Sequence, residues 1–183
     1  MRMFVALEVP QTLKAELQEA LDYFMRLSPG GINWVKPQNL HLTVNFIGEV
    51  AENKIEALQN LLAASTEKHE AAYLNAEGYE LFPARFPRLL WLKLNGSDKD
   101  LRILNRQLIS SLRSLNIEAD PKALKLHVTL GRIKQQQRMD FERAVMAHPV
   151  CRDTLKWDTL SLYQSTLRPE GPIYTPLQQY NLR

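Results

Sequence analysis

The stretch LHLTVNFIG at residues 40–48 decides how the chain is read, because it alternates like a half-buried strand. Successive side chains of a strand point to opposite faces, so residues two apart share one face. Leu42 and Val44 then belong to an apolar face, while His41 and Thr43 lie together on the other. A strand with one polar face is ordinary in an antiparallel sheet, so this stretch alone indicates no function.

The same pattern returns in the second half of the chain as LHVTLGRI at residues 126–133. His127 aligns with His41 and Thr129 with Thr43, and apolar residues occupy the flanking positions in both copies. The histidines lie 86 positions apart, about half of the chain, so each half contributes one copy. One His-x-Thr pair is a weak signal, but two copies in matched apolar frames favour a paired site and an internal duplication.

Two such strands brought together would surround one phosphate group. Same-face residues of a strand lie about 6.5–7 Å apart, a span that a hydrogen-bonded phosphate bridges in large part. One neutral imidazole would act as general base on a water, and one protonated imidazole as general acid on the leaving oxygen. The hydroxyls of Thr43 and Thr129 would donate to the non-bridging oxygens. This chemistry needs no metal ion, and it does not decide which histidine takes which role.

The composition of the 183-residue chain is that of a globular protein, with 45% hydrophobic and 23% charged residues. The net charge of +3 allows a polyanionic partner without requiring one. Cys151 is the only cysteine, which excludes an intramolecular disulfide and a multi-cysteine zinc site. No apolar run is long enough for a signal-peptide core or a membrane span, so a cytoplasmic protein is expected.

The apolar spacing predicts helices and strands in alternation. Helices are expected at residues 11–27, 51–64 and about 98–115. Strands are expected at residues 3–9, 40–48, 72–81, 89–94 and 126–133, with a closing pair at 154–166 and 173–179. No linker rich in Gly or Ser separates independent domains, so one domain over residues 1–183, built from two intertwined lobes, is expected. The alternation alone is equally compatible with a parallel α/β sheet.

The two His-x-Thr copies resemble the paired HxTx motifs of the 2H phosphoesterases. Within that superfamily the chain is similar to the RNA 2′,3′-cyclic phosphodiesterase branch, also called 2′-5′ RNA ligase. The similarity covers essentially the whole chain and rests on MFVALEVP, WVKPQNLHLT, RLLWLKL, HVTLGRIK and LYQSTLRPEGPIYTPL. It implies an α+β fold with two antiparallel sheets flanking a central cleft, helices outside, and one HxTx strand in each lobe. The segment QQQRMDFERAVMAHPVC at residues 135–151 fits no pattern of that family.

The resemblance implies metal-independent hydrolysis of an RNA 3′-terminal 2′,3′-cyclic phosphate to a 2′-phosphate, without a cofactor. In the family assignment His41 donates a proton to the O3′ leaving group, and His127 accepts a proton from the attacking water. A 5′-hydroxyl in place of water would give 2′-5′ RNA ligation. One alternative is the same site acting on 2′-5′ oligoadenylates or small cyclic nucleotides. Another is a non-catalytic module that binds RNA ends, although such a module has no need of both imidazoles. A monomer is expected, because a cleft between two lobes is complete within one chain.

Two residues beside the motifs are further candidates for substrate binding. Strict alternation would turn Arg132 away from His127, but a bulge after Gly131 would return its guanidinium to the phosphate. Tyr174, in the closing strand pair, is a candidate for stacking on a base.

The residues next to Arg132 and their counterparts in the first copy are assigned to the core or to the cleft. Phe46, the counterpart of Arg132 in the first copy, is expected in the core, with stacking on a base as the alternative. Asn45 is expected to share the face of His41 and to line the cleft. Its counterpart Gly131, which lacks a side chain, would leave room there for the substrate.

Overall fold

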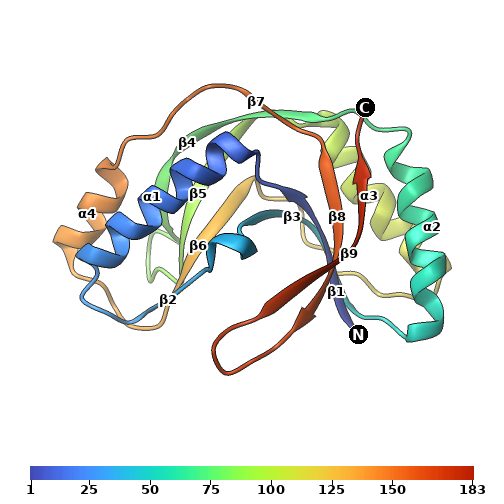
Figure 1. Ribbon diagram of the computed structural model, residues 1–183, viewed down its shortest axis with the longest axis horizontal. Coiled ribbons are helices and arrows are strands. Elements are labelled where there is room, and N and C mark those ends of the chain that lie inside the picture. The colour runs from blue at the N-terminus through green and yellow to red at the C-terminus, as the bar shows by residue number, and fades with distance from the viewer.

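The computed structural model describes residues 1–183 as an α+β protein with two antiparallel sheets and four α-helices (Figure 1). The strands are β1 (Arg2–Glu8), β2 (Ile32–Trp34), β3 (His41–Glu49), β4 (Ala72–Phe82), β5 (Leu89–Ser97), β6 (His127–Ile133), β7 (Leu155–Trp157), β8 (Thr159–Thr166) and β9 (Ile173–Asn181). The helices are α1 (Gln11–Leu27), α2 (Ile55–Thr66), α3 (Lys99–Ser114) and α4 (Met139–Ala147), with short 3₁₀ turns η1 (Pro37–Asn39) and η2 (Glu52–Lys54). None of the helices is both long and apolar enough to span a membrane.

The two sheets have the same internal order. The first sheet runs β3-β1-β8-β9 and the second runs β2-β6-β5-β4-β7, so β3, β1 and β8 correspond to β6, β5 and β4. Each motif strand pairs antiparallel with the strand that precedes it by one long helix, α1 in the first case and α3 in the second. This repeated strand–helix–strand unit agrees with the duplication that the two motifs predict. The antiparallel pairing excludes the parallel sheet that the alternation also allowed.

The helices cover the sheet faces turned away from the centre of the molecule, and each half of the chain lends a helix to the other sheet (Figure 1). Helix α1 follows β1 of the first sheet but packs on the second, where the Phe24 ring meets that of Tyr79 of β4 at 5.1 Å. Helix α3 follows β5 of the second sheet but packs on β3 of the first. Helices α4 and α2 complete the two outer layers, on β4 and β9 respectively.

The buried core lies between these helices and the apolar sheet faces, because the helices bury residues at three- and four-residue spacing. Leu17 and Phe24 of α1, like Leu104 of α3, have no exposed surface. On the motif strands, Leu42 and Val128 are also fully buried. Each motif strand therefore turns its apolar side chains to the helices, which leaves the opposite face, with the histidine and the threonine, for the cleft.

The element boundaries follow the apolar spacing closely in the helices and less closely near the C-terminus. The helix expected at 51–64 consists of the turn η2 followed by α2. Residues 141–147, ambiguous in the sequence, belong to α4. The single strand expected at 154–166 is wrong, because the chain leaves the second sheet after β7 and enters the first sheet with β8.

Candidate active site

The two motif strands begin at their histidines and meet where the sheets come together. His41 is the first residue of β3 and His127 the first of β6, and these two strands contact each other across the centre of the molecule (Figure 1). The two imidazoles are close enough for the charge of one to affect the pKa of the other. The fold thus brings together the four motif residues, with His41 and Thr43 on one side of the cleft and His127 and Thr129 on the other.

Both histidine rings are held in the same way by the backbone. His41 Nδ1 lies 2.7 Å from the carbonyl oxygen of Asn39, and His127 Nδ1 lies 3.0 Å from that of Lys125. A carbonyl oxygen only accepts, so each Nδ1 carries the proton, and each Nε2 of a neutral ring presents a lone pair. His41 Nε2 lies 2.9 Å from Thr43 Oγ1, whose hydroxyl then donates to it. Both rings are thus preset in orientation, and the Thr43 hydroxyl that now donates to His41 Nε2 has to turn away when a ligand binds there.

The environment keeps both imidazoles neutral in the free protein. The pKa of His41 is lowered to about 4, first by burial and then by the electrostatic interactions with His127 and Arg132, against the opposing effect of the hydrogen bond to the Asn39 carbonyl. The pKa of His127 is also lowered, first by burial and then by Lys125 and Arg132, while its hydrogen bond to the Lys125 carbonyl opposes the shift. Arg132 acts on both rings, so its guanidinium lies near both.

A bulge explains why Arg132 is on the histidine face. In the pairing of β6 with β5, Thr129 lies opposite Trp91 and Gly131 opposite Leu90, so the strand has one extra residue between them. Such a residue resets the alternation of side chains. Arg132, opposite Leu89, consequently faces the same side as the motif histidine and threonine.

The first motif contains the same bulge at the equivalent place. Thr43 lies opposite Ala6 and Asn45 opposite Val5, so the extra residue is Val44. The next cleft-facing position is then Phe46, which aligns with Arg132 of the second copy. The two halves therefore present the same backbone with different chemistry, an aromatic ring on one side and a guanidinium on the other.

The bulges also overturn three expectations drawn from strict alternation. Phe46 was expected in the core but is 51% exposed. Asn45 was expected in the cleft but is only 3% exposed, and its side-chain amide donates to the carbonyl of Asn105 in α3 at 3.3 Å. Gly131 leaves room for the fold rather than for substrate, because a Cβ there would lie 2.7 Å from Ile32 Cγ2 of β2.

Aromatic rings line the first-sheet side of the site. The Tyr174 ring meets the His41 ring edge-on at 5.4 Å, and the buried Phe4 ring lies 5.0 Å from His41. Phe4 also contacts Tyr163 at 5.1 Å and Phe46 at 6.3 Å. Burial raises the pKa of Tyr174, while the nearby Arg132 and Arg2 oppose the rise. Tyr174 thus lies beside His41 and close enough to Arg132 to feel its charge.

On the second-sheet side, two more rings extend from the second histidine. The Trp91 ring centre lies 4.3 Å from that of His127, and the Phe82 ring stacks on Trp91 at 4.1 Å. The indole nitrogen of Trp91 donates to Glu80 at 2.8 Å. The face of β4, β5 and β6 that meets the cleft therefore carries a row of aromatic rings beside His127.

One polar cluster beside the site was missed in the sequence. Glu8 lies directly opposite His41 in the β1–β3 pairing. Its Oε1 accepts hydrogen bonds from Ser161 Oγ at 2.7 Å, from Gln179 Nε2 at 2.5 Å and from the Tyr163 hydroxyl at 3.4 Å. The alternation of β1 gives Glu8 a face, but only the pairing register shows that this face belongs to the motif histidine.

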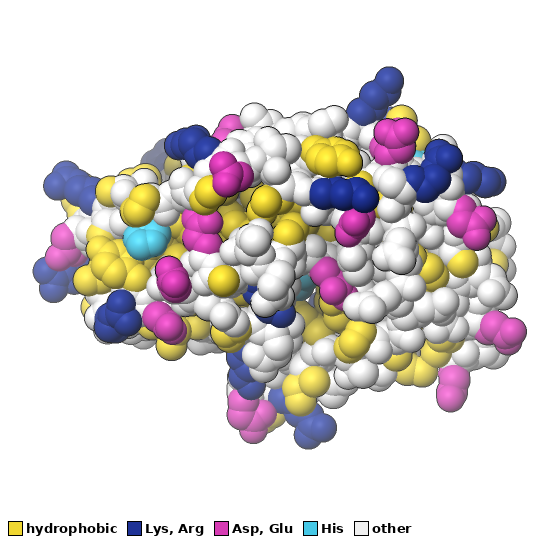
Figure 2. Space-filling model, turned by 45° about the horizontal axis from the view of Figure 1, so that its top comes forward, with side chains coloured by type: hydrophobic (Ala, Val, Ile, Leu, Met, Phe, Trp, Pro, Cys, Tyr) yellow, Lys and Arg dark blue, Asp and Glu magenta, His cyan; other side chains and the backbone are white.

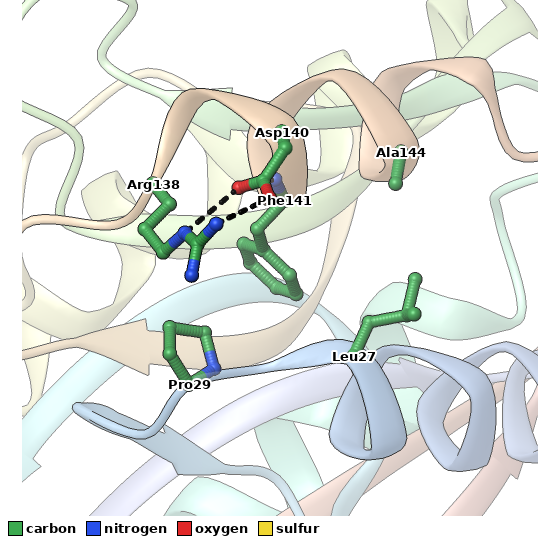
Figure 3. A pocket seen from close by; sticks show the side chains of 6 residues that line it. All are labelled: Leu27, Pro29, Arg138, Asp140, Phe141 and Ala144. Carbon is green, nitrogen blue, oxygen red and sulfur yellow. Dashed lines mark hydrogen bonds and ion pairs between the residues drawn. The ribbon is translucent and has the colours of Figure 1, made fainter.

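Other features of the surface are separate from the histidine pair. A pocket of about 280 Å³ lies between the C-terminus of α1 and helix α4, where Arg138 and Asp140 form an ion pair at 2.9 Å (Figure 3). Leu27, Pro29, Phe141 and Ala144 complete its lining. The structure contains no group of three or more His, Cys, Asp or Glu side chains that could hold a metal ion.

Comparison with known proteins gives matches along the whole chain. The family model described as LigT-like phosphoesterase matches residues 7–91. An RNA 2′,3′-cyclic phosphodiesterase of Archaeoglobus fulgidus is 30% identical, with 98% of this chain and 99% of the relative aligned. The protein of the same name from Thermus thermophilus is 31% identical over 100% of this chain and 91% of its own length.

Solved structures show the same fold. The crystal structure of TT0787 of Thermus thermophilus matches with a TM-score of 0.78 at 27% identity, covering 100% of this chain and 98% of the other. That of E. coli LigT complexed with NADP⁺ matches with a TM-score of 0.70 at 25% identity, covering 99% and 97%. The fold is thus shared with solved proteins over essentially the full length of the chain.

Proposed function

The chain belongs to the LigT-like phosphoesterase family, and from this premise we propose that it hydrolyses RNA 3′-terminal 2′,3′-cyclic phosphates to 2′-phosphates. The observation that carries the proposal is the matched pair of imidazoles, each fixed by a hydrogen bond from Nδ1 to a backbone carbonyl. Two fixed Nε2 atoms on opposite sides of one cleft are what in-line displacement at phosphorus requires. One takes the proton of the nucleophile, and the other gives a proton to the leaving oxygen.

In the proposed mechanism His127 Nε2 accepts a proton from a water whose oxygen attacks the phosphorus. The bond from phosphorus to O3′ breaks, and O3′ takes its proton from His41 Nε2, which leaves the phosphate on O2′. Thr43 and Thr129 donate to the non-bridging oxygens, and Arg132 neutralises the negative charge that they carry. Tyr174 covers the nucleoside beside His41.

The bound phosphate has to reverse the pKa shift of the proton donor. In the free protein the pKa of His41 is about 4, chiefly because the ring is buried and in part because His127 and the positively charged Arg132 disfavour a second charge there. An anion seated between the strands compensates these charges and favours the protonated imidazole. The opposite assignment of the two histidines uses the same atoms.

A substrate with an activated leaving group tests the assignment. Such a leaving group needs no general acid. The rate of hydrolysis of a p-nitrophenyl phosphodiester should therefore be little changed by His41→Ala and strongly lowered by His127→Ala. The reverse pattern would exchange the two roles.

The direct test of function uses an RNA oligonucleotide that ends in a 2′,3′-cyclic phosphate, incubated with EDTA. Wild type should convert this end to a 2′-phosphate, which chromatography identifies on the RNA product. The substitutions His41→Ala and His127→Ala should each slow the reaction by about 10²–10⁴-fold. His148→Ala is the matched control, because His148 follows α4 and its ring stacks on Tyr23 of α1, outside the cleft. Binding of the RNA without turnover would instead favour a module that captures RNA ends. Turnover only of 2′-5′ oligoadenylates or small cyclic nucleotides would move the proposal to those substrates.

The remaining parts of the proposal concern the state of the protein. The site is formed entirely by residues of one chain, which supports action as a monomer and as a single domain of residues 1–183. The proposed substrate is RNA, and the proposed location is the cytoplasm. The acid–base pair supplies both proton transfers, so the rate in EDTA should equal the rate without it. Ligation by a 5′-hydroxyl in place of water uses the same two histidines in the same roles: His127 accepts the proton of the 5′-hydroxyl, and His41 gives a proton to O3′.

A further inference from the structure

Beyond the terminal nucleotide, we propose that Phe86, with Arg85, is a stacking site for an RNA base on the 5′ side of the cyclic phosphate. The inference rests on the proposed function, since it takes an RNA 3′ end as the ligand of the cleft. It extends that function by assigning a second contact, outside the motif residues, which recognises the length of the RNA.

Phe86 is held in an unusual conformation. Its φ is +58°, a left-handed backbone conformation that bulky residues rarely adopt, and 78% of its surface is exposed. Such a backbone conformation is strained for a bulky side chain, and exposing its ring gives up burial as well. Its one aromatic or charged neighbour in ring contact is Arg85, whose guanidinium lies 5.4 Å from the ring centre. The fold itself therefore gains little from this ring.

The loop that carries Phe86 continues the floor of the cleft past Arg132. Phe82 and Leu89, which flank the loop, are paired with each other, and Leu89 lies opposite Arg132. Paired residues share a face, so both ends of the loop are on the face of the motif histidine. The Arg88 carbonyl accepts from the Ile133 amide at 2.8 Å, which fixes the loop to the end of β6 (Figure 1).

A row of groups connects this loop with the reacting centre. From His127 the rings of Trp91 and Phe82 follow at 4.3 and 4.1 Å. Along β6, Arg132 lies five residues beyond His127, about 15 Å at the usual rise of a strand. We place the terminal phosphate of the RNA between the two histidines. If the RNA then runs along β6 past Arg132, one of its upstream nucleotides reaches the loop.

The charges of the loop suit such a ligand. Arg85 and Arg88 flank Phe86, and neither they nor Arg132 form an ion pair with a carboxylate in the structure. Charged side chains of both signs are scattered over the face shown in Figure 2, and they form no continuous basic surface there. Binding of a nucleotide outside the cleft therefore depends on a local contact. An exposed ring beside unpaired guanidinium groups is the combination by which proteins bind single-stranded nucleic acid without reading its sequence.

The test compares two substrates with the same reacting end. These are adenosine 2′,3′-cyclic phosphate and a tetranucleotide that ends in the same group. Phe86→Asn removes the ring while keeping a residue that accepts positive φ. It should lower kcat/KM for the tetranucleotide by about 5- to 100-fold, the usual effect of losing one stacked base, and leave the mononucleotide unchanged. Phe86→Trp should restore the tetranucleotide rate, and Met139→Ala, which removes another exposed apolar side chain, should change neither rate.

Equal losses on both substrates in Phe86→Asn, or no loss on either, would overturn the inference. A wild-type protein that hydrolyses neither substrate would overturn the proposed function instead. In that case the stacking role of Phe86 is tested by binding of a tetranucleotide with a 2′-phosphate end, measured by fluorescence anisotropy. The dissociation constant should rise by the same factor in Phe86→Asn, and an unchanged constant would reject the stacking site.

Discussion

The low pKa of His41 predicts that folding stability falls steeply on mild acidification. The pKa of His41 is about 4 in the folded protein, against 6.5 for a free histidine side chain. Between these two values the unfolded chain binds a proton that the folded protein does not. Stability supplied by this group is therefore fully present above pH 6.5 and is lost as the pH falls toward 4.

The two pKa values fix the size of the effect. From pH 7.0 to pH 4.5, proton linkage at this one site removes about 2 kcal/mol from the free energy of unfolding. This is an upper value, because the His41 side chain is only half-buried and keeps contact with water. It is still a large part of the usual stability of a domain, which is about 5–15 kcal/mol.

Urea unfolding followed by circular dichroism at both pH values measures the loss, with wild type and His41→Gln compared at constant ionic strength. Carboxylates and His127 contribute in both proteins, so the difference between the two losses isolates His41. His41→Asn repeats the comparison with a second neutral side chain. Equal losses in wild type and both variants, within about 0.5 kcal/mol, would refute the argument that burial and neighbouring positive charges keep His41 neutral.

Three further substitutions probe the groups around the motifs. Arg132→Gln should lower kcat/KM for the cyclic phosphate by about tenfold or more and move the acid limb of its pH profile upward, because Arg132 lowers the pKa of both histidines; an unchanged profile would place its charge elsewhere. Asn105→Ala should cost about 1–3 kcal/mol in chemical denaturation, since the Asn105 amide donates to the carbonyl of the bulge residue Val44 at 2.8 Å in a buried setting. Gly131→Ala should cost about 1–3 kcal/mol by overpacking, as the new methyl group meets Ile32, and a thermal shift below about 1 °C would contradict the contact.

The sequence predicted three of the four helices and the pairing of the motifs, because these follow from local periodicity and from the repeated motif. The two antiparallel sheets were predicted from the resemblance to the 2H phosphoesterases, since periodicity alone also allowed a parallel sheet. It placed Leu42 and Val128 in the core and the motif histidines on the opposite faces, since each motif is regular up to its threonine. The faces of the residues after each threonine were predicted less well. A bulge is defined by the partner strand, so the sequence allowed one at Gly131 but did not show those at Val44 and Leu130.

The same limit explains the missed cluster around Glu8. Its three donors come from β8 and β9, more than 150 residues along the chain, and nothing in the sequence around Glu8 indicates them. The division between β7 and β8 is another non-local feature. Both segments have strand-like composition, and only the sheets that they join distinguish them.

The exchange of helices between the two sheets has a consequence for motion. An enzyme that closes on its substrate by rotating two bodies needs a hinge, a few residues through which the chain passes between them. Here the chain passes from one side to the other repeatedly, with α1 and β2 on the second sheet between β1 and β3 of the first, and α3 on the first sheet between β5 and β6 of the second. No single segment can serve as that hinge. The two walls are expected to stay at a fixed separation, so that substrate enters and product leaves by loop and side-chain movements while the backbone of the cleft stays rigid.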